Sequence, residues 1–195
     1  VRQILHAGWE IAARAAETTG AFVFADIGPV AGMPHTDILD EYHFLAEEFL
    51  ACGAKHFLFE TNSSADGLIE TARYIKKKCP EAFILDSFSA FPGGYTRDGR
   101  FVEELVHEAA DSHVVDAVGF NCMNGIHQMK ELIHRLEPHD LPLSLMPNAG
   151  HPIIVDGRTF YQSDPSYFGI SLASLAQEGV SIVGGCCGTT PTYIH

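Results

Sequence analysis

Three of the five cysteines stand where they could bind one metal ion. Cys186 and Cys187 are adjacent, and the glycines on either side of the pair allow backbone torsions that turn both thiols toward one centre. A disulfide between adjacent cysteines would be strained. Cys122 follows a predicted strand and would complete a set of three thiolates. Three protein ligands with one open position are typical of catalytic zinc.

Two other interpretations of these thiols stay open. Free cysteine is among the most buried residue types, so all three could be ordinary core residues. Neither a CxxC nor an HxxxH pattern supports a metal here. Alternatively, the adjacent pair could be a redox device in a different barrel enzyme, which predicts a reducible disulfide and metal-independent behaviour. A redox pair would need no third, distant thiol, so Cys122 argues against it.

Polar side chains also stand at the ends of predicted strands. They are Glu60, Thr61, Ser87, Asn121 and Asn148. Ligands of parallel α/β proteins gather at the carboxyl ends of the strands, so we expect these side chains near the thiols. Thr61, Ser87 and Asn121 could donate hydrogen bonds that steady metal ligands. Each could equally satisfy nearby backbone groups, and Glu60 could cap a helix or pair with a lysine.

The elements that must position these residues follow from the hydrophobic pattern. Six short runs, apolar throughout, are typical of strands buried on both faces of a parallel sheet. They span residues 21–27, 55–60, 82–88, 115–121, 141–146 and 180–184. Apolar positions at helical spacing predict a helix over 37–53, with Asp37 as its N-cap and Gly53 as its stop. Shorter helical stripes begin at Phe101, Ile126 and Leu172.

The alternation of strands and helices predicts an α/β fold with a parallel sheet. The sequence after Ile27 lacks the GxGxxG and phosphate-loop patterns. The sheet could belong to a doubly wound fold or to a barrel. A TIM (β/α)₈ barrel normally needs about 250 residues, and with six strands this chain is about two strands short of one. Residues 1–195 are expected to form one domain. The stretch 147–165 is expected to be a long, functional loop.

Composition excludes several classes of function. The chain has 195 residues, with 12 Lys and Arg against 25 Asp and Glu, giving a net charge of −13. Such a chain repels phosphate backbones and anionic lipid, so we expect neither nucleic acid nor membrane as a partner. The sequence contains no apolar run of the roughly 20 residues that a membrane helix needs. Five cysteines do not suggest a disulfide framework, which favours a reducing, cytoplasmic location.

Two motifs resemble the zinc-binding motifs of the homocysteine S-methyltransferase family. They are GFNC at residues 119–122 and the longer GGCCGTTP at 184–191. The segments 26–29 (DIGP) and 60–61 (ET) resemble further motifs of that family at strand ends. The PNAG segment at 147–150, with the residues that follow it, resembles one branch of the family. That branch comprises the homocysteine-binding module of cobalamin-dependent methionine synthase and the methyltransferase–methylenetetrahydrofolate reductase fusions.

The resemblance covers essentially the whole chain and implies a function. It implies that Cys122, Cys186 and Cys187 bind Zn²⁺, which activates the thiol of homocysteine for methylation to methionine. Glu60 is the best candidate to pair with the substrate ammonium, and Thr61 is expected to be a further substrate-binding residue. The resemblance also suggests that Asn148 orients substrate or occupies the open zinc position. The methyl donor is expected to be methylcobalamin or a methylfolate-linked group on another domain or protein, with betaine and S-methylmethionine as alternatives.

The sequence also departs from the family pattern. Family members begin with two further strands and an acidic DGA-type motif, which this chain lacks, and the chain stops at His195, where a last helix should begin. With the resemblance, we therefore expect a TIM (β/α)₈-type barrel of about six βα units that lacks the first two strands, in a domain truncated at both ends. An open six-strand sheet would expose edges that a partner or a second copy would cover. The alternative function is a catalytically incompetent zinc-binding or scaffold module.

Overall fold

The computed structural model describes residues 1–30, 35–136 and 139–194. In this part of the chain six parallel strands form one sheet, in the order β1-β2-β3-β4-β5-β8. The strands are β1 (Phe24–Ile27), β2 (His56–Asn62), β3 (Phe83–Phe88), β4 (Ala117–Asn121), β5 (Leu143–Met146) and β8 (Ile182–Val183). Each lies within one of the predicted apolar runs or extends it slightly, so the prediction of a parallel α/β sheet is confirmed.

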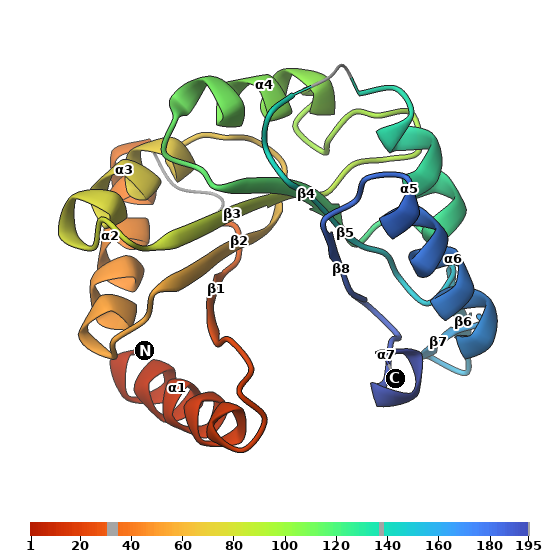
Figure 1. Cartoon of the computed structure of the whole chain (residues 1–195), viewed down its shortest axis with the longest axis horizontal. Coiled ribbons are helices and arrows are strands. Elements are labelled where there is room, and N and C mark those ends of the chain that lie inside the picture. The colour runs from red at the N-terminus through yellow and green to blue at the C-terminus, as the bar shows by residue number, and fades with distance from the viewer. Residues whose placement is uncertain (31–34, 137–138, 195) are drawn as a thin grey trace.

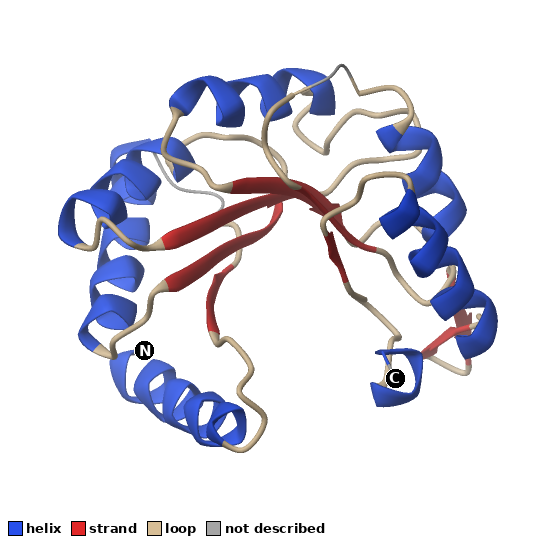
Figure 2. Ribbon diagram, in the orientation of Figure 1, coloured by secondary structure: helices blue, strands red, loops and turns tan. Residues whose placement is uncertain are grey.

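Helices cover the convex side of this sheet, which curves into an open arc (Figures 1 and 2). They are α1 (Arg2–Glu17), α2 (His35–Ala51), α3 (Leu68–Lys78), α4 (Val102–Ser112), α5 (Ile126–Ile133), α6 (Pro165–Gln177) and α7 (Pro191–Ile194). Helices α1 and α7 stand at the two ends of the arc. None of the helices in the described ranges is long and apolar enough to span a bilayer.

Apolar side chains fill both faces of the strands, as the unbroken hydrophobic runs require. Phe57 and Phe59 of β2 are fully buried in the larger core between the sheet and the helices. Leu58, between them, belongs to a smaller cluster with Leu85 and Ala117. Because side chains alternate along a strand, this smaller cluster and Glu60 lie on the concave face. The concave face therefore carries apolar residues in its middle and polar residues at the carboxyl ends of the strands.

Three details differ from the sequence-based expectation. Asp37 lies in the first turn of α2, which already begins at His35, so it is not the N-cap. Helix α3, whose buried side chains include Leu68, Ala72 and Ile75, was not predicted. The stretch 147–165 is not irregular but contains the antiparallel hairpin of β6 (Pro152–Val155) and β7 (Arg158–Tyr161). Asp156 and Gly157, both with positive φ, form its turn, the Asp-Gly signal of a tight hairpin.

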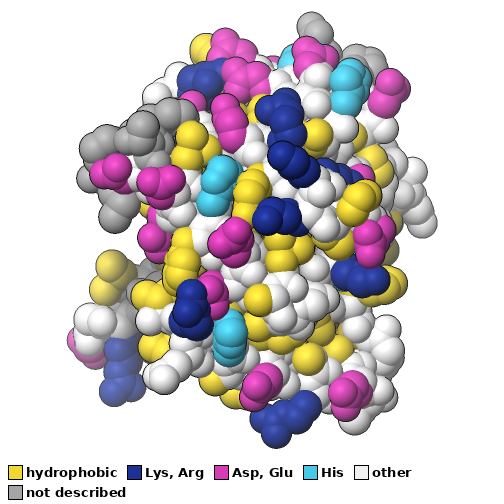
Figure 3. All heavy atoms as spheres, turned by 90° about the vertical axis from the view of Figure 1, so that its left-hand side faces the viewer, with side chains coloured by type: hydrophobic (Ala, Val, Ile, Leu, Met, Phe, Trp, Pro, Cys, Tyr) yellow, Lys and Arg dark blue, Asp and Glu magenta, His cyan; other side chains and the backbone are white. Residues whose placement is uncertain are grey.

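Helix α1 is held to its neighbour α2 by ion pairs and an aromatic contact. Glu48 of α2 accepts from Arg2 at 2.7 Å and pairs with His6 at 2.9 Å, while Trp9 packs edge-on against Phe49. Ile4, on the free side of α1, is 79% exposed. Figure 3 looks onto this end of the molecule, where acidic, basic and apolar side chains are interspersed.

Candidate metal and substrate site

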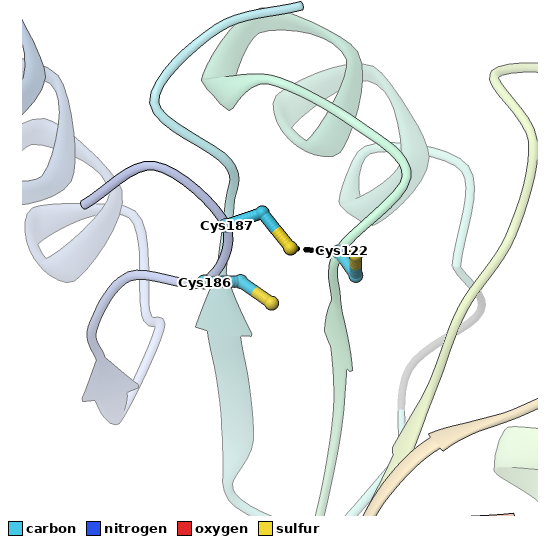
Figure 4. A group of neighbouring side chains, drawn as sticks. All are labelled: Cys122, Cys186 and Cys187. Carbon is cyan, nitrogen blue, oxygen red and sulfur yellow. Dashed lines mark hydrogen bonds between the residues drawn. The ribbon is translucent and has the colours of Figure 1, made fainter. Parts of the chain in front are cut away.

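The carboxyl ends of β4 and β8 bring three sulfur atoms together. Cys122 directly follows β4, and Cys186 and Cys187 lie in the loop after β8. The three Sγ atoms lie within 4.8 Å of one another, and those of Cys122 and Cys187 are 3.6 Å apart. Figure 4 shows the side chains pointing toward a common centre. We call these residues the three-cysteine cluster; the predicted convergence is present.

The backbone around the cluster is unusual and is fixed by neighbouring strands. Cys122 and Met123 have φ of 59° and 57°, in the left-handed region that non-glycine residues rarely adopt. The Cys122 amide donates to the Met146 carbonyl at 3.2 Å, and that of Cys186 donates to the Pro147 carbonyl at 2.8 Å. Such strained residues persist where the surrounding structure over-determines them, often at functional sites.

Two glycines in the cysteine motifs, Gly119 and Gly185, stand where an added Cβ would clash with neighbouring atoms. A Cβ on Gly119 would lie 2.3 Å from the Ser144 carbonyl oxygen of the next strand, so only glycine lets β4 and β5 pair here. A Cβ on Gly185 would lie 2.5 Å from Thr189 Cγ2. Gly188 has φ of +81°, as expected of a residue that turns the chain beside the cysteine pair.

Asn121 joins three strand ends beside the cluster. Its Oδ1 accepts from the Thr61 amide at 3.0 Å and from Ser87 Oγ at 2.7 Å. Its Nδ2 donates to Thr61 Oγ1 at 2.6 Å and toward Cys186 Sγ at 3.8 Å. The side chain is fully buried, so these bonds fix its orientation. The structure thus places Asn121, Thr61 and Ser87 together next to the thiols.

Asn148 supports the other side of the cluster. It is 4% exposed, and its Oδ1 accepts from the Cys187 amide at 3.1 Å. Its backbone amide donates to the Asn124 carbonyl at 3.0 Å, in the loop that begins at Cys122. Asn148 therefore links both cysteine-bearing loops, and its placement beside the thiols agrees with the sequence-based expectation.

The pKa values of Cys122 and Cys186 are shifted in opposite directions. The pKa of Cys122 is lowered to about 5, chiefly because the Cys186 thiol donates a hydrogen bond to its thiolate; the Met123 amide, Cys187 and Asn148 also contribute. The pKa of Cys186 is raised, first by its interaction with the Cys122 sulfur and then by burial. One thiolate is therefore present at neutral pH, ready to act as a ligand.

Carboxylates line the concave face near the cluster. Glu60 is half-buried, and burial, then Asp26 and Cys122, raise its pKa. Partial burial also raises the pKa of Asp26 on β1. Glu60 forms no ion pair with any described residue, which argues against the lysine-pairing alternative. Asp26, which opens the DIGP segment, was missed as a neighbour of Glu60.

Tyr161, the last residue of β7, was also missed. Burial, and then the neighbouring Cys187 sulfur, raise the pKa of Tyr161. A Cβ on Gly188 would lie 2.3 Å from Tyr161 Cγ, so the ring packs onto the turn that follows the cysteine pair. No sequence signal short of recognising the hairpin could have placed it beside the cysteines.

A cavity of about 790 Å³ opens beside the cluster, at the carboxyl ends of the first three strands. Thr61 and Met123 line its side nearest the thiols, and Tyr42, Ser63 and Arg97 line other parts. It is large enough for an amino acid with room to spare.

Comparisons with known proteins agree with this geometry. The profile of the family described as "Homocysteine S-methyltransferase" matches residues 1–195. The methionine synthase of Mycobacterium tuberculosis (strain ATCC 25618 / H37Rv) is 30% identical over 227 residues, covering 100% of this chain but 18% of that protein. Homocysteine S-methyltransferase YbgG of Bacillus subtilis (strain 168) is 27% identical over 121 residues, covering 61% of this chain and 38% of YbgG. The chain thus spans less than half the length of either relative.

A solved structure shows the same fold. The apo form of the Escherichia coli homocysteine methyltransferase MmuM aligns with a TM-score of 0.76 and 23% identity, covering 99% of this chain and 71% of MmuM. Because MmuM is a TIM barrel, this confirms the predicted barrel class, of which the described residues form a partial, six-stranded arc.

Proposed function

The chain belongs to the homocysteine S-methyltransferase family, and we propose that it forms the methyl-acceptor site for homocysteine, with zinc held by Cys122, Cys186 and Cys187. The observation that carries the proposal is the convergence of three sulfur atoms from two distant segments. A methyl group would pass to the homocysteine sulfur, giving methionine. The donor–carbon bond breaks, its electron pair leaves with the donor, and the thiol proton passes to solvent.

The cluster fits a zinc ion in donor type and spacing. Ligands about 2.3 Å from zinc at the corners of a tetrahedron lie about 3.8 Å apart. The Cys122–Cys187 separation of 3.6 Å is close to that value. Three thiolates also leave the fourth position open, as in catalytic zinc sites. A zinc ion bound there would supply the Lewis acidity that lets a substrate thiol lose its proton at neutral pH.

The protein's own residues prepare this site and orient the substrate. Asn121 donates to the Cys186 sulfur and Asn148 accepts from the Cys187 amide, and these two bonds hold the cysteine pair in place. Glu60 and Asp26 provide the negative charge that an amino acid's ammonium group needs, and Thr61, next to Glu60 in sequence, lines the cavity. The substrate would therefore lie with its thiol at the cluster and its ammonium at Glu60.

We further propose that the methyl donor is carried by another domain or protein, as methylcobalamin or a methylfolate-linked group. The PNAG segment and the similarity to a methionine synthase support this choice. Cys187 of the cluster is exposed, which leaves the site accessible to such a partner.

Calorimetric titration tests the acceptor site without knowledge of the donor. We expect the zinc-loaded chain to bind L-homocysteine with release of a proton and to bind L-homoserine, which has a hydroxyl in place of the thiol, much more weakly. Equal binding of the two compounds, or none, would contradict the proposal and favour the scaffold alternative.

A further inference from the structure

We propose that Arg97, in the cavity beside the three-cysteine cluster, binds the α-carboxylate of the amino acid substrate. The inference rests on the proposed function, because it adds a substrate contact to that same site. The thiol and the ammonium group of homocysteine have proposed partners, but its carboxylate has none. In a chain with a net charge of −13, a carboxylate is repelled unless a cation stands at its binding position.

Arg97 is the one cationic side chain among the described residues that line the cavity. It is exposed and forms no ion pair with any described residue. Two acids, Asp66 and Asp98, share the lining, but neither pairs with it, and Asp98 accepts a hydrogen bond from Ser63 Oγ instead. The guanidinium group can therefore bind a ligand without first breaking an ion pair.

The turn that carries Arg97 is fixed to the end of β2. Thr96 donates through Oγ1 to the Ser63 carbonyl at 2.6 Å, and Ser63 Oγ donates to Asp98. The Gly99 amide closes the turn by donating to the Thr96 carbonyl at 3.0 Å. Both neighbours of Arg97 in the sequence are thus bound to the same serine, which sets the place of its backbone at the cavity.

This placement matches the shape of an amino acid. The ammonium and carboxylate groups are bonded to one carbon, so their partners must stand close together. Glu60 and Ser63 are three residues apart, a span of at most roughly 10 Å. Met123, which follows Cys122 directly, lines the same cavity as Arg97. One ligand in the cavity could therefore meet Glu60, Arg97 and the three-cysteine cluster at once.

Three ligands separate the carboxylate from the other groups of the substrate. L-Homocysteine carries all groups, 4-mercaptobutyrate lacks the ammonium, and 3-aminopropane-1-thiol lacks the carboxylate. Calorimetry with the zinc-loaded chain measures the affinity of each for the wild type, Arg97→Gln and Arg97→Lys. Arg14→Gln is the matched control, because Arg14 is exposed on α1 and does not line the cavity. Circular dichroism melting shows that each variant is folded.

We expect Arg97→Gln to weaken binding of L-homocysteine and 4-mercaptobutyrate roughly tenfold, the low end for a hydrogen bond to a charged group. Binding of 3-aminopropane-1-thiol should not change. Arg97→Lys should recover part of the loss, because lysine keeps the charge but not the two-pronged geometry that matches a carboxylate. Arg14→Gln should match the wild type with all three ligands.

Two results would overturn the inference and leave the acceptor site standing. One is wild-type affinity of Arg97→Gln for L-homocysteine. The other is an equal loss for all three ligands, which would assign Arg97 a structural role. Failure of the wild type itself to bind L-homocysteine would overturn the proposed function and this inference with it.

Discussion

At the scale of single residues, the site depends on side chains that hold the thiols as much as on the thiols themselves. Asn121 connects β2, β3 and β4 through its amide and reaches the loop after β8 through Cys186. Because it is fully buried, its loss would leave several donors and acceptors without partners.

We therefore expect Asn121→Ala to weaken zinc binding by roughly 10- to 100-fold. Chelator competition measures the change. Ser87→Ala, which removes one bond to Asn121 and leaves its contact with Cys186, should have a smaller effect. Unchanged affinity in Asn121→Ala would show that the cysteines keep their geometry without it.

Glu60 is expected to recognise the substrate ammonium. A hydrogen bond to a charged group contributes about 1.5–3 kcal/mol, so Glu60→Gln should weaken homocysteine binding by roughly 10- to 100-fold. 4-Mercaptobutyrate, which lacks the ammonium, is the control ligand. Its affinity should hardly differ between wild type and variant in calorimetry. An equal loss for both ligands would assign Glu60 a structural role instead.

The pH dependence of this binding follows from the raised pKa of Glu60. The carboxylate must be charged to hold an ammonium group, so affinity falls as pH is lowered through its pKa. Because burial and Asp26 raise that pKa, the loss should begin at a higher pH than for an ordinary glutamate. Glu60→Gln should abolish this part of the pH profile.

The site residues were predictable from sequence to the extent that they end strands. Cys122, Asn148 and Glu60 follow apolar runs, and the parallel arrangement brings such positions to one edge. Tyr161 was not predictable, because its place depends on a hairpin and on the missing side chain of Gly188. Helix α6 and strand β8 separate Tyr161 from Gly188 in the sequence.

At the scale of elements, close pairing of β4 and β5 sets the position of Cys122. Gly119 makes this possible, since a Cβ there would meet backbone atoms of Ser144. The strands were predictable because both faces of the sheet are apolar. Helix α3 was missed because its charged residues obscure a short buried stripe, and the hairpin was missed because its strands are largely exposed.

Gly119→Ala is expected to destabilise the chain by roughly 1–3 kcal/mol, the usual cost of overpacking, or more because the clash is with backbone. Gly169→Ala is the matched control. Gly169 lies inside α6 with no atom within 4 Å of an added Cβ, so its replacement should stabilise by about 0.5–1 kcal/mol. Denaturant unfolding measures both changes. Equal effects would contradict the steric role of Gly119.

At the scale of the whole molecule, the larger core contains one carboxyl group without a hydrogen-bond partner among the described residues. Asp86 of β3 is fully buried between the sheet and the helices, and burial raises its pKa to about 7. Between about pH 4 and pH 7 the folded state therefore binds more protons than the unfolded state. The free energy of unfolding should fall as pH rises through this window.

Asp86→Asn removes this titration while nearly preserving shape. We expect the variant to be more stable than the wild type above pH 7, by up to about 4 kcal/mol, with the difference shrinking toward pH 4. Denaturant unfolding across that range measures it. A difference that does not change with pH would show that Asp86 is not the titrating group.

The open arc leaves both edge strands, β1 and β8, without neighbours among the described residues. The concave face, with the three-cysteine cluster at its rim, is where a substrate and a donor-bearing partner would meet the chain. The proposed acceptor site depends on the three cysteines acting as one metal site.

Zinc content of the purified chain tests that claim most directly, measured for the wild type, Cys186→Ser and the control Cys52→Ser, whose cysteine follows α2 away from the cluster. We predict about one zinc per chain in the wild type and in Cys52→Ser, and almost none in Cys186→Ser. A folded wild type without zinc, or zinc retained in Cys186→Ser, would contradict the account.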